Sequence, residues 1–153
     1  MLSSLPLRTI AIAGLIGELL FEAYAWLVSP LVFGVTLEPA NLVSALFKMY
    51  LGVQLPYPVA FVIHVGIGIV GFGLAVWCLH RLTKLPLVAA GVVSGFVLWF
   101  VAQGFLAQLV GRDFMMGFGA YTQSSFFAHV GMAAVMGLIM ALLTRSKTAV
   151  TQA

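Results

Sequence analysis

Two carboxylates one helical turn apart, Glu18 and Glu22, lie within a stretch of sequence that is otherwise strongly apolar. A charged side chain near the centre of a bilayer costs about 2.5–3.5 kcal/mol, so an acid in such a stretch indicates a functional site. On a helix the two side chains share one face, which must be turned away from lipid. The pair predicts a site for a proton or small cation, or a protonated carboxyl that hydrogen-bonds to a neighbouring helix.

Two histidines, His64 and His129, each lie near the start of another apolar stretch. If the two helices run in the same direction, the imidazoles lie at similar depth and could relay protons, hold a metal or ligate a b-type haem axially. Alternatively, each imidazole bonds a carbonyl or hydroxyl group of a neighbouring helix. Haem b is the weaker of these alternatives because only Lys48 and Arg112 could meet its propionates on that side.

These residues are expected to form one polar intramembrane site. Ser29-Pro30 should bend or end the first helix, which would bring Glu22 close to the histidines. Gln103, in a third apolar stretch, is a neutral hydrogen-bonding partner for them. The predicted site therefore consists of Glu18, Glu22, His64, His129 and Gln103.

The composition places these residues in a membrane. Hydrophobic residues make up 63% of the chain and charged residues 7%, whereas a soluble domain carries about 25% charged residues. Runs of about 20 apolar residues cross the bilayer as helices, because only helices and closed barrels satisfy the backbone there. The sequence predicts one all-α transmembrane domain over residues 1–153, a bundle of four helices at about 10–33, 58–79, 86–110 and 124–143.

The segments between these helices also carry signals. Glu38-Pro39 is typical of a helix start, and the following residues place Leu42, Leu46 and Met49 on one face, which predicts a short amphipathic helix at the outer interface. Thr122, Ser124 or Ser125 could cap the last helix.

Lys and Arg residues set the orientation. Five lie on the side of the chain ends and two on the other, so both termini should be cytoplasmic in a bacterial inner membrane. The five are Arg8, Arg81, Lys84, Arg145 and Lys147, and the two are Lys48 and Arg112. Ala23-Tyr24-Ala25 resembles a signal-peptide cleavage site, but Glu18 and Glu22 interrupt the apolar region before it and argue against cleavage.

Glycines predict where helices touch. Gly66, Gly68 and Gly71 spell a G-x-G-x-x-G pattern that follows no strand, so helix packing explains it better than dinucleotide binding. Gly91 and Gly95 form a G-x-x-x-G pair, which we expect to pack within the bundle rather than in a homodimer.

A faint repeat links the two halves of the sequence. Residues 59–74 match 124–139 at Phe61/Phe126, His64/His129, Val65/Val130, Gly66/Gly131 and Val70/Val135. Residues 13–34 match 90–111 more weakly, at Ala13/Ala90, Gly14/Gly91, Ala25/Ala102 and Gly34/Gly111. The matches permit a duplicated helical hairpin in which the second and fourth helices run in parallel.

From about residue 58 to 143, the order of features resembles the YagU-like family of uncharacterised bacterial inner-membrane proteins. The resemblance is carried by Phe61-Val-Ile-His64, the basic turn His80-Arg-Leu-Thr-Lys84, Leu85-Pro86 and Ser124-Ser-Phe-Phe-Ala-His129. It implies an inner-membrane bundle with a link to acid stress, and it brings no mechanism.

The motifs favour a protein that is not an enzyme. No catalytic triad, P-loop, zinc motif or redox C-x-x-C pair is found in the sequence, and no resident metal or cofactor is expected. The leading hypothesis is a multi-pass inner-membrane protein whose polar site handles protons or a small cation. An accessory subunit of a larger membrane complex and a haem-bearing electron-transfer subunit are the alternatives; the expected partner is the lipid bilayer, not nucleic acid.

Overall fold

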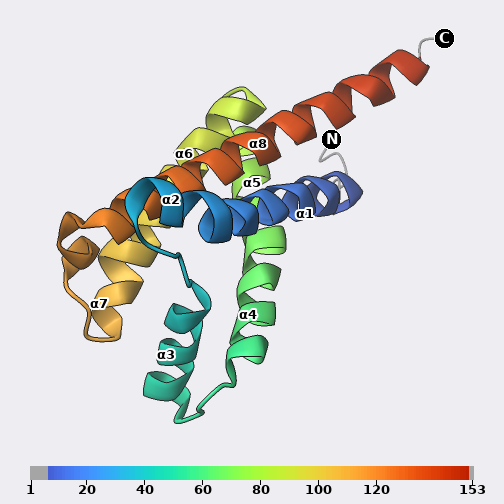
Figure 1. Cartoon of the computed structure of the whole chain (residues 1–153). Helices are drawn as coiled ribbons and strands as arrows, with labels where there is room; N and C mark the ends of the chain where they lie inside the picture. The colour runs from blue at the N-terminus through green and yellow to red at the C-terminus, as the bar shows by residue number, and fades with distance from the viewer. Residues whose placement is uncertain (1–6, 152–153) are drawn as a thin grey trace.

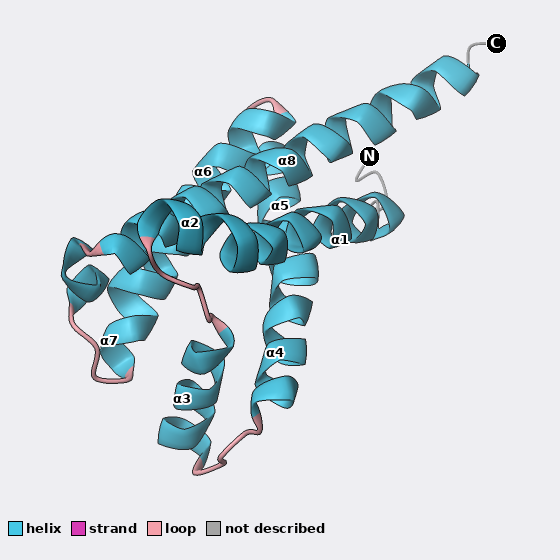
Figure 2. Ribbon diagram, viewed as in Figure 1, coloured by secondary structure: helices cyan, strands magenta, loops and turns pink. Residues whose placement is uncertain are grey.

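The computed structural model describes residues 7–151, with side chains up to residue 144, and this range contains helices and loops but no strand (Figure 2). Four helices in it are long and apolar enough to cross a membrane: Leu7–Phe33, Tyr57–Thr83, Leu87–Leu109 and Ala120–Thr144. The predicted all-α, four-span architecture is therefore confirmed. The large apolar side chains exposed along these helices, such as Leu31 and Val62, are those that lipid would cover.

The first span consists of α1 (Leu7–Ala23), a π-helical segment η1 (Tyr24–Val28) and α2 (Ser29–Phe33). Pro30 has no N–H to donate, so the regular hydrogen-bond ladder changes just before it, and the wider π turn takes up the change. The helix continues past Ser29-Pro30 and ends at Gly34, whose φ of 69° suits glycine.

The predicted short helix is present as α3 (Ala40–Leu51), which packs beside α4 (Tyr57–Gly66) (Figure 1). The second span then continues through the π-helical η2 (Ile67–Phe72) and α5 (Gly73–Thr83). The predicted end at residue 79 is four residues short, because His80 to Thr83 form a last helical turn that Lys84 closes at a φ of 63°.

The third span consists of α6 (Leu87–Phe100), the π-helical η3 (Val101–Leu106) and α7 (Ala107–Leu109). A 3-10 helix, η4 (Phe114–Phe118), leads to α8 (Ala120–Thr151).

The last helix begins four residues earlier than predicted. Gly119 is extended and its carbonyl accepts the backbone N–H of Gln123, so the first turn of α8 starts at Ala120. Thr122, Ser124 and Ser125 consequently do not cap α8. They lie buried inside it and bond to other segments; the Thr122 hydroxyl, for example, donates to the Met115 carbonyl at 2.6 Å.

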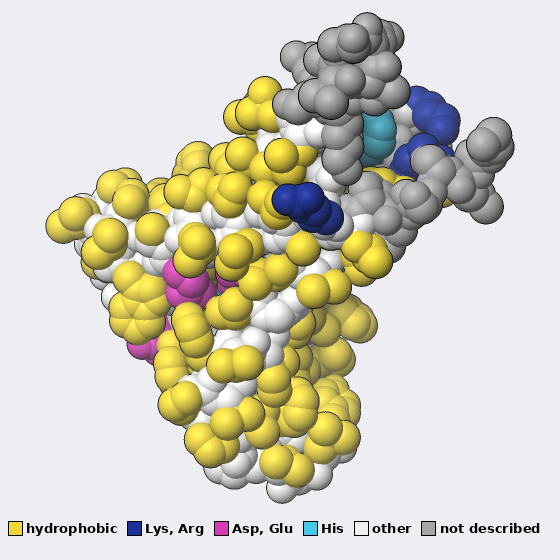
Figure 3. All heavy atoms as spheres, turned by 90° about the vertical axis from the view of Figure 1, so that its right-hand side faces the viewer, with side chains coloured by type: hydrophobic (Ala, Val, Ile, Leu, Met, Phe, Trp, Pro, Cys, Tyr) yellow, Lys and Arg dark blue, Asp and Glu magenta, His cyan; other side chains and the backbone are white. Residues whose placement is uncertain are grey.

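The described ends of the chain lie on the same side of the molecule as the turn between α5 and α6, whereas η4 and the ends of α3 lie away from that side (Figure 1). This is the up-and-down course that the predicted topology needs. On the face shown in Figure 3, hydrophobic side chains dominate and the visible Lys and Arg side chains lie towards the upper end. Which side faces the cytoplasm remains a prediction.

Close contact between backbones holds α6 against α8. A Cβ at Gly95 would lie 2.6 Å from the His129 carbonyl oxygen, and one at Gly91 would overlap the Ala133 backbone. Met132, Met136 and Met140 are buried in the core beside this contact.

Gly66, Gly68 and Gly71 of the second span were all predicted to pack against another helix, but the structure separates them. Gly68 is buried against α1, whereas Gly66 and Gly71 are exposed. A Cβ at Gly66 would meet nothing within 4 Å, and one at Gly71 would meet only Ile67 of the same helix. Gly66 and Gly71 therefore contact no other helix, and the prediction that they are packing positions is wrong. Of the three glycines in the G-x-G-x-x-G pattern, Gly68 alone packs against a neighbouring helix.

Candidate functional site

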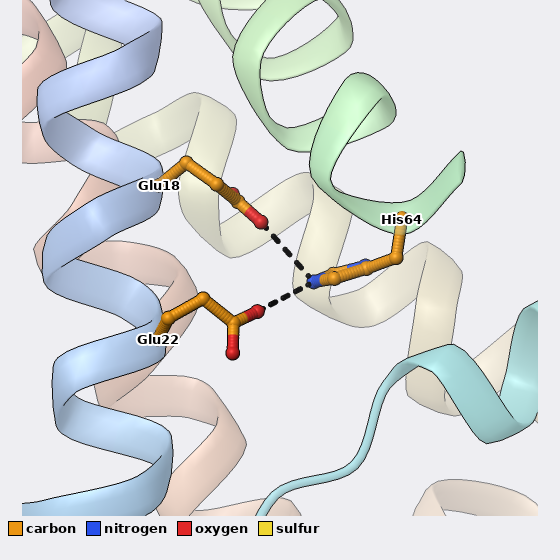
Figure 4. A group of neighbouring side chains, drawn as sticks. All are labelled: Glu18, Glu22 and His64. Atoms are coloured by element: carbon orange, nitrogen blue, oxygen red, sulfur yellow. Dashed lines mark ion pairs between the residues drawn. The ribbon is translucent and has the colours of Figure 1, made fainter. Parts of the chain in front are cut away.

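Three polar side chains converge between the first and second spans (Figure 4). Glu18 and Glu22 point from α1 towards His64 of α4. The Nε2 atom of His64 lies 3.3 Å from Oε1 of Glu18 and 3.5 Å from Oε1 of Glu22. We call these three side chains the acid–imidazole cluster.

Glycines bring the two spans close enough for this meeting. A Cβ at Gly14 would overlap the carbonyl of Ile69, so α1 touches the backbone of η2 one turn before Glu18. A Cβ at Gly68 would overlap the carboxylate of Glu18 itself. Gly68 thus forms a notch, one turn after His64, in which the Glu18 carboxylate lies.

Burial leaves the cluster without its usual hydrogen bonds. Glu18 is 2% exposed, and no hydrogen bond reaches either of its carboxylate oxygens. Oε1 of Glu22 and Nε2 of His64 are also buried without a partner. A single imidazole nitrogen can hold one proton and direct it at one acceptor, so His64 cannot satisfy two carboxylates at once. Buried polar atoms of this kind are rare in folded proteins and need an explanation.

Glu22 has one further contact that fixes its position. The indole Nε1–H of Trp26 donates to Oε2 of Glu22 at 3.0 Å, one turn along the same span. The other carboxylate oxygen is thereby left to face His64.

His129 does not join the cluster. Its Nδ1–H donates to the Ser125 carbonyl at 2.8 Å, one turn earlier in α8. Gln103 donates to the hydroxyl of Ser125 at 3.3 Å and lies 6% exposed, so Gln103 also belongs to this second group and not beside Glu22. The predicted five-residue site is therefore divided into two: the acid–imidazole cluster, and a group of Gln103, Ser125 and His129.

The ring of Phe21 separates the two histidines. Its centroid lies 5.5 Å from that of His64 and 5.5 Å from that of His129. A haem held by both imidazoles would need the space that Phe21 fills, and the Nε2 atom of His64 points at the carboxylates instead. The geometry therefore does not fit the bis-histidine haem alternative.

A cavity of about 180 Å³ extends between α3, η3 and α8 and reaches both histidines. Its wall is mostly apolar, with Leu42 and Leu46 of α3 on one side, and Arg112 and Tyr121 also line it. This cavity could not be predicted from the sequence, since its wall combines residues from all four spans and the short helix. It supplies a space from which water or a small ion could reach His64.

Chemically, the cluster offers two carboxylate oxygens and one imidazole nitrogen whose atoms all lie within 4.8 Å of one another. Such a set can share protons or hold a cation. Sequence reasoning named all three residues, but it missed Gly68 as the notch for Glu18; the only signal was that Gly68 follows His64 by one helical turn.

No family model, curated protein or solved structure matches the chain. The resemblance to the YagU-like family remains a prediction.

Proposed function

We propose that this multi-pass membrane protein takes up and releases a proton or a small cation at the acid–imidazole cluster. The observation that carries the proposal is the set of four buried atoms without hydrogen bonds: both oxygens of Glu18, Oε1 of Glu22 and Nε2 of His64. A proton or cation between them would supply the missing interactions. Ionisable residues within membrane spans are rare, pair with one another or with backbone carbonyls, and mark ion or proton pathways. His129 is paired with a carbonyl, whereas Nε2 of His64 lies 3.3 and 3.5 Å from two carboxylates without a hydrogen bond to either.

The cavity supports exchange with the surroundings. It reaches the His64 ring from the side of α3 and Arg112, although neither glutamate lines it, so it brings water or an ion as far as the imidazole of the cluster. The proposal concerns binding and release at this site.

Infrared difference spectroscopy of the purified protein tests the proposal. When pH or cation concentration is changed, we expect glutamate carboxyl and carboxylate bands to interconvert in the wild type and to be lost in Glu18→Gln and Glu22→Gln. Asp113→Asn removes an exposed carboxylate whose side chain caps no helix, and it should keep those bands.

A wild-type spectrum that responds to neither pH nor cations would contradict the proposal. So would a wild-type difference spectrum that stays unchanged in both glutamate variants. In either case the accessory-subunit alternative would take precedence, because the polar groups would then only hold helices together.

A further inference from the structure

We infer that the cation of the acid–imidazole cluster is a divalent transition-metal ion of the first row, such as Zn²⁺ or Fe²⁺, held by Glu18, Glu22 and His64. The inference rests on the proposed function and narrows it from a proton or small cation to one class of ion. Four features of the structure support it: the spacing of the donor atoms, their charge, their chemical type and the notch at Gly68.

The spacing of the donor atoms fits a central ion better than a direct hydrogen bond. A charge-assisted N–H···O bond is about 2.7–2.9 Å long, whereas the two imidazole-to-carboxylate distances are 3.3 and 3.5 Å. Two donors that each lie about 2.1 Å from a tetrahedral ion are separated by about 3.4 Å. The distances from Nε2 of His64 to both Oε1 atoms thus match a shared ion, and the ligand atoms of the three residues all lie within 4.8 Å of one another.

Charge selects a divalent ion. Two ionised carboxylates, a neutral imidazole and a divalent cation carry no net charge together. A monovalent cation in the same place would leave one negative charge uncompensated while both carboxylates stay ionised, and it would need a proton on one of them to reach neutrality. Because Glu18 is 2% exposed, water contributes little to offset that charge.

The imidazole selects the type of divalent ion. Ca²⁺ and Mg²⁺ prefer oxygen ligands, whereas imidazole suits Zn²⁺, Fe²⁺ and their neighbours. Three protein ligands leave a position of the ion open for water or another small ligand. His64 lines the cavity, so such a ligand has a space from which to come.

Gly68 forms part of the proposed metal site although it offers no ligand atom. The Glu18 carboxylate lies where the side chain of any other residue at position 68 would be. Gly68→Ala would push the carboxylate away while all three ligands stay in the chain. Gly66, two residues earlier on the same helix, has nothing within 4 Å of its Cβ position, so Gly66→Ala is a matched control.

The test is a Co²⁺ titration of the metal-free, detergent-purified protein, followed by visible absorption, with Zn²⁺ as competitor. We expect one Co²⁺ per chain, a spectrum typical of nitrogen and oxygen ligands, and displacement by Zn²⁺. Glu18→Gln, Glu22→Gln and His64→Gln should each weaken binding by about 100-fold or more, since even the loss of an outer-shell partner costs 10–100-fold.

The controls separate the site from adventitious binding. His80→Gln and Asp113→Asn remove a histidine and a carboxylate outside the cluster and should leave Co²⁺ affinity unchanged. Gly68→Ala should weaken binding, and Gly66→Ala should not. If a ligand substitution prevents folding, as judged by circular dichroism and gel filtration, the Gly68 and Gly66 pair still decides.

Absence of stoichiometric Co²⁺ binding by the wild type would overturn the metal inference, as would equal affinities in wild type and Gly68→Ala. If the infrared bands of Glu18 and Glu22 still respond to pH, the proposed function then stands as a proton site. If neither Co²⁺ nor pH changes those bands, both the inference and the proposed function fail.

Discussion

The first two spans pack against each other as the last two spans do, but the histidines of the two pairs have different surroundings. Gly14 of α1 meets the backbone of Ile69, and Gly91 of α6 meets Ala133 and Ala134 of α8. Under the two sequence matches of the repeat, Gly14 corresponds to Gly91 and Ile69 to Ala134. The carbonyl that each glycine meets thus lies within one residue of the matched position, which supports a duplicated hairpin.

The difference lies in what surrounds the imidazole. His64 faces two carboxylates and makes no hydrogen bond through Nε2, whereas His129 bonds to the carbonyl of Ser125. In the same matches, Glu18 and Glu22 correspond to Gly95 and Trp99. Gly95 is in close contact with α8, and the Trp99 indole donates to the Thr122 carbonyl at 3.1 Å. One hairpin thus carries two carboxylates and an imidazole nitrogen without hydrogen bonds, and the other uses the equivalent positions for packing, although Oε1 of its Gln103 is also buried without a hydrogen bond.

If the two hairpins are equivalent, both must insert into the membrane in the same orientation. Reporters fused after Ala153 and in the turn around Lys84 should both be cytoplasmic, and a reporter in the segment from Gly111 to Gln123 should lie outside. The effect is all or none for each fusion, and reporter activity measures it. Finding the Ala153 and 111–123 fusions on one side would refute the four-span topology.

Backbone contacts should be equally sensitive in both halves. Gly14→Leu and Gly91→Leu should each lower the free energy of unfolding by about 3 kcal/mol or more, because the new side chain meets a main-chain carbonyl that cannot move aside. Val97→Leu, at a side chain 49% exposed, is the control and should have little effect. Denaturation in detergent measures all three.

If only one of the two glycine substitutions is destabilising, the halves are not equivalent. Equal tolerance of Gly91→Leu and Val97→Leu would contradict the α6–α8 contact itself.

Substitution of the two histidines should change the free energy of unfolding by different amounts, because only one of them is hydrogen-bonded. His129→Leu removes a buried donor to Ser125 and should cost about 1–3 kcal/mol of unfolding free energy. His64→Leu removes no hydrogen bond through Nε2, and the Glu18 and Glu22 carboxylates that it leaves behind can be neutralised by protons, so the change should be within about 1 kcal/mol of zero, of either sign. Thermal unfolding of the two variants side by side checks this.

A larger loss for His64→Leu than for His129→Leu would reverse the comparison. It would mean that the acid–imidazole cluster chiefly stabilises the fold.

An effect similar to that of His129→Leu is expected where the first half contacts α8 near η4. The hydroxyls of Ser29 and Ser124 lie 2.6 Å apart, both residues are fully buried, and the Ser29 hydroxyl also donates to the Val35 carbonyl. Ser29→Ala should lower the free energy of unfolding by about 1–3 kcal/mol, since the hydroxyl that makes both contacts is lost. Substituting both serines should cost less than the sum of the single substitutions, which a double-mutant cycle would show. Additive losses would mean that the two hydroxyls do not interact.

The spans could be predicted because they depend on a local property, the length of an apolar run. The boundaries that shifted depend on short-range geometry instead: the extended conformation of Gly119 starts α8 early, and Lys84 closes α5 late. Near Pro30, the sequence indicated an irregularity but not that a π turn would absorb it.

The candidate site was only partly predictable, for a non-local reason. His64 and His129 have similar neighbours in sequence, and each is followed one turn later by a small residue, Gly68 or Ala133. Their difference comes from the facing helix, which brings carboxylates to one and Gly95 to the other. Nothing near Gln103 in sequence indicated that its partner would be Ser125 rather than a glutamate.

The three π-helical segments give the first three spans a place where a change of length can be absorbed. A π turn holds one residue more than an α turn, so deleting one residue within Ile67–Phe72 would let the span run on as a regular α-helix. The wide turn covers with that extra residue about the same rotation that an α-helix covers without it, so the helix beyond the deletion would keep its buried face. Val70 is exposed, so its loss would remove no core contact, and Val76 would stay in the core. The same deletion within the α-helical Tyr57–Gly66 would instead turn everything beyond it by about 100° about the helix axis.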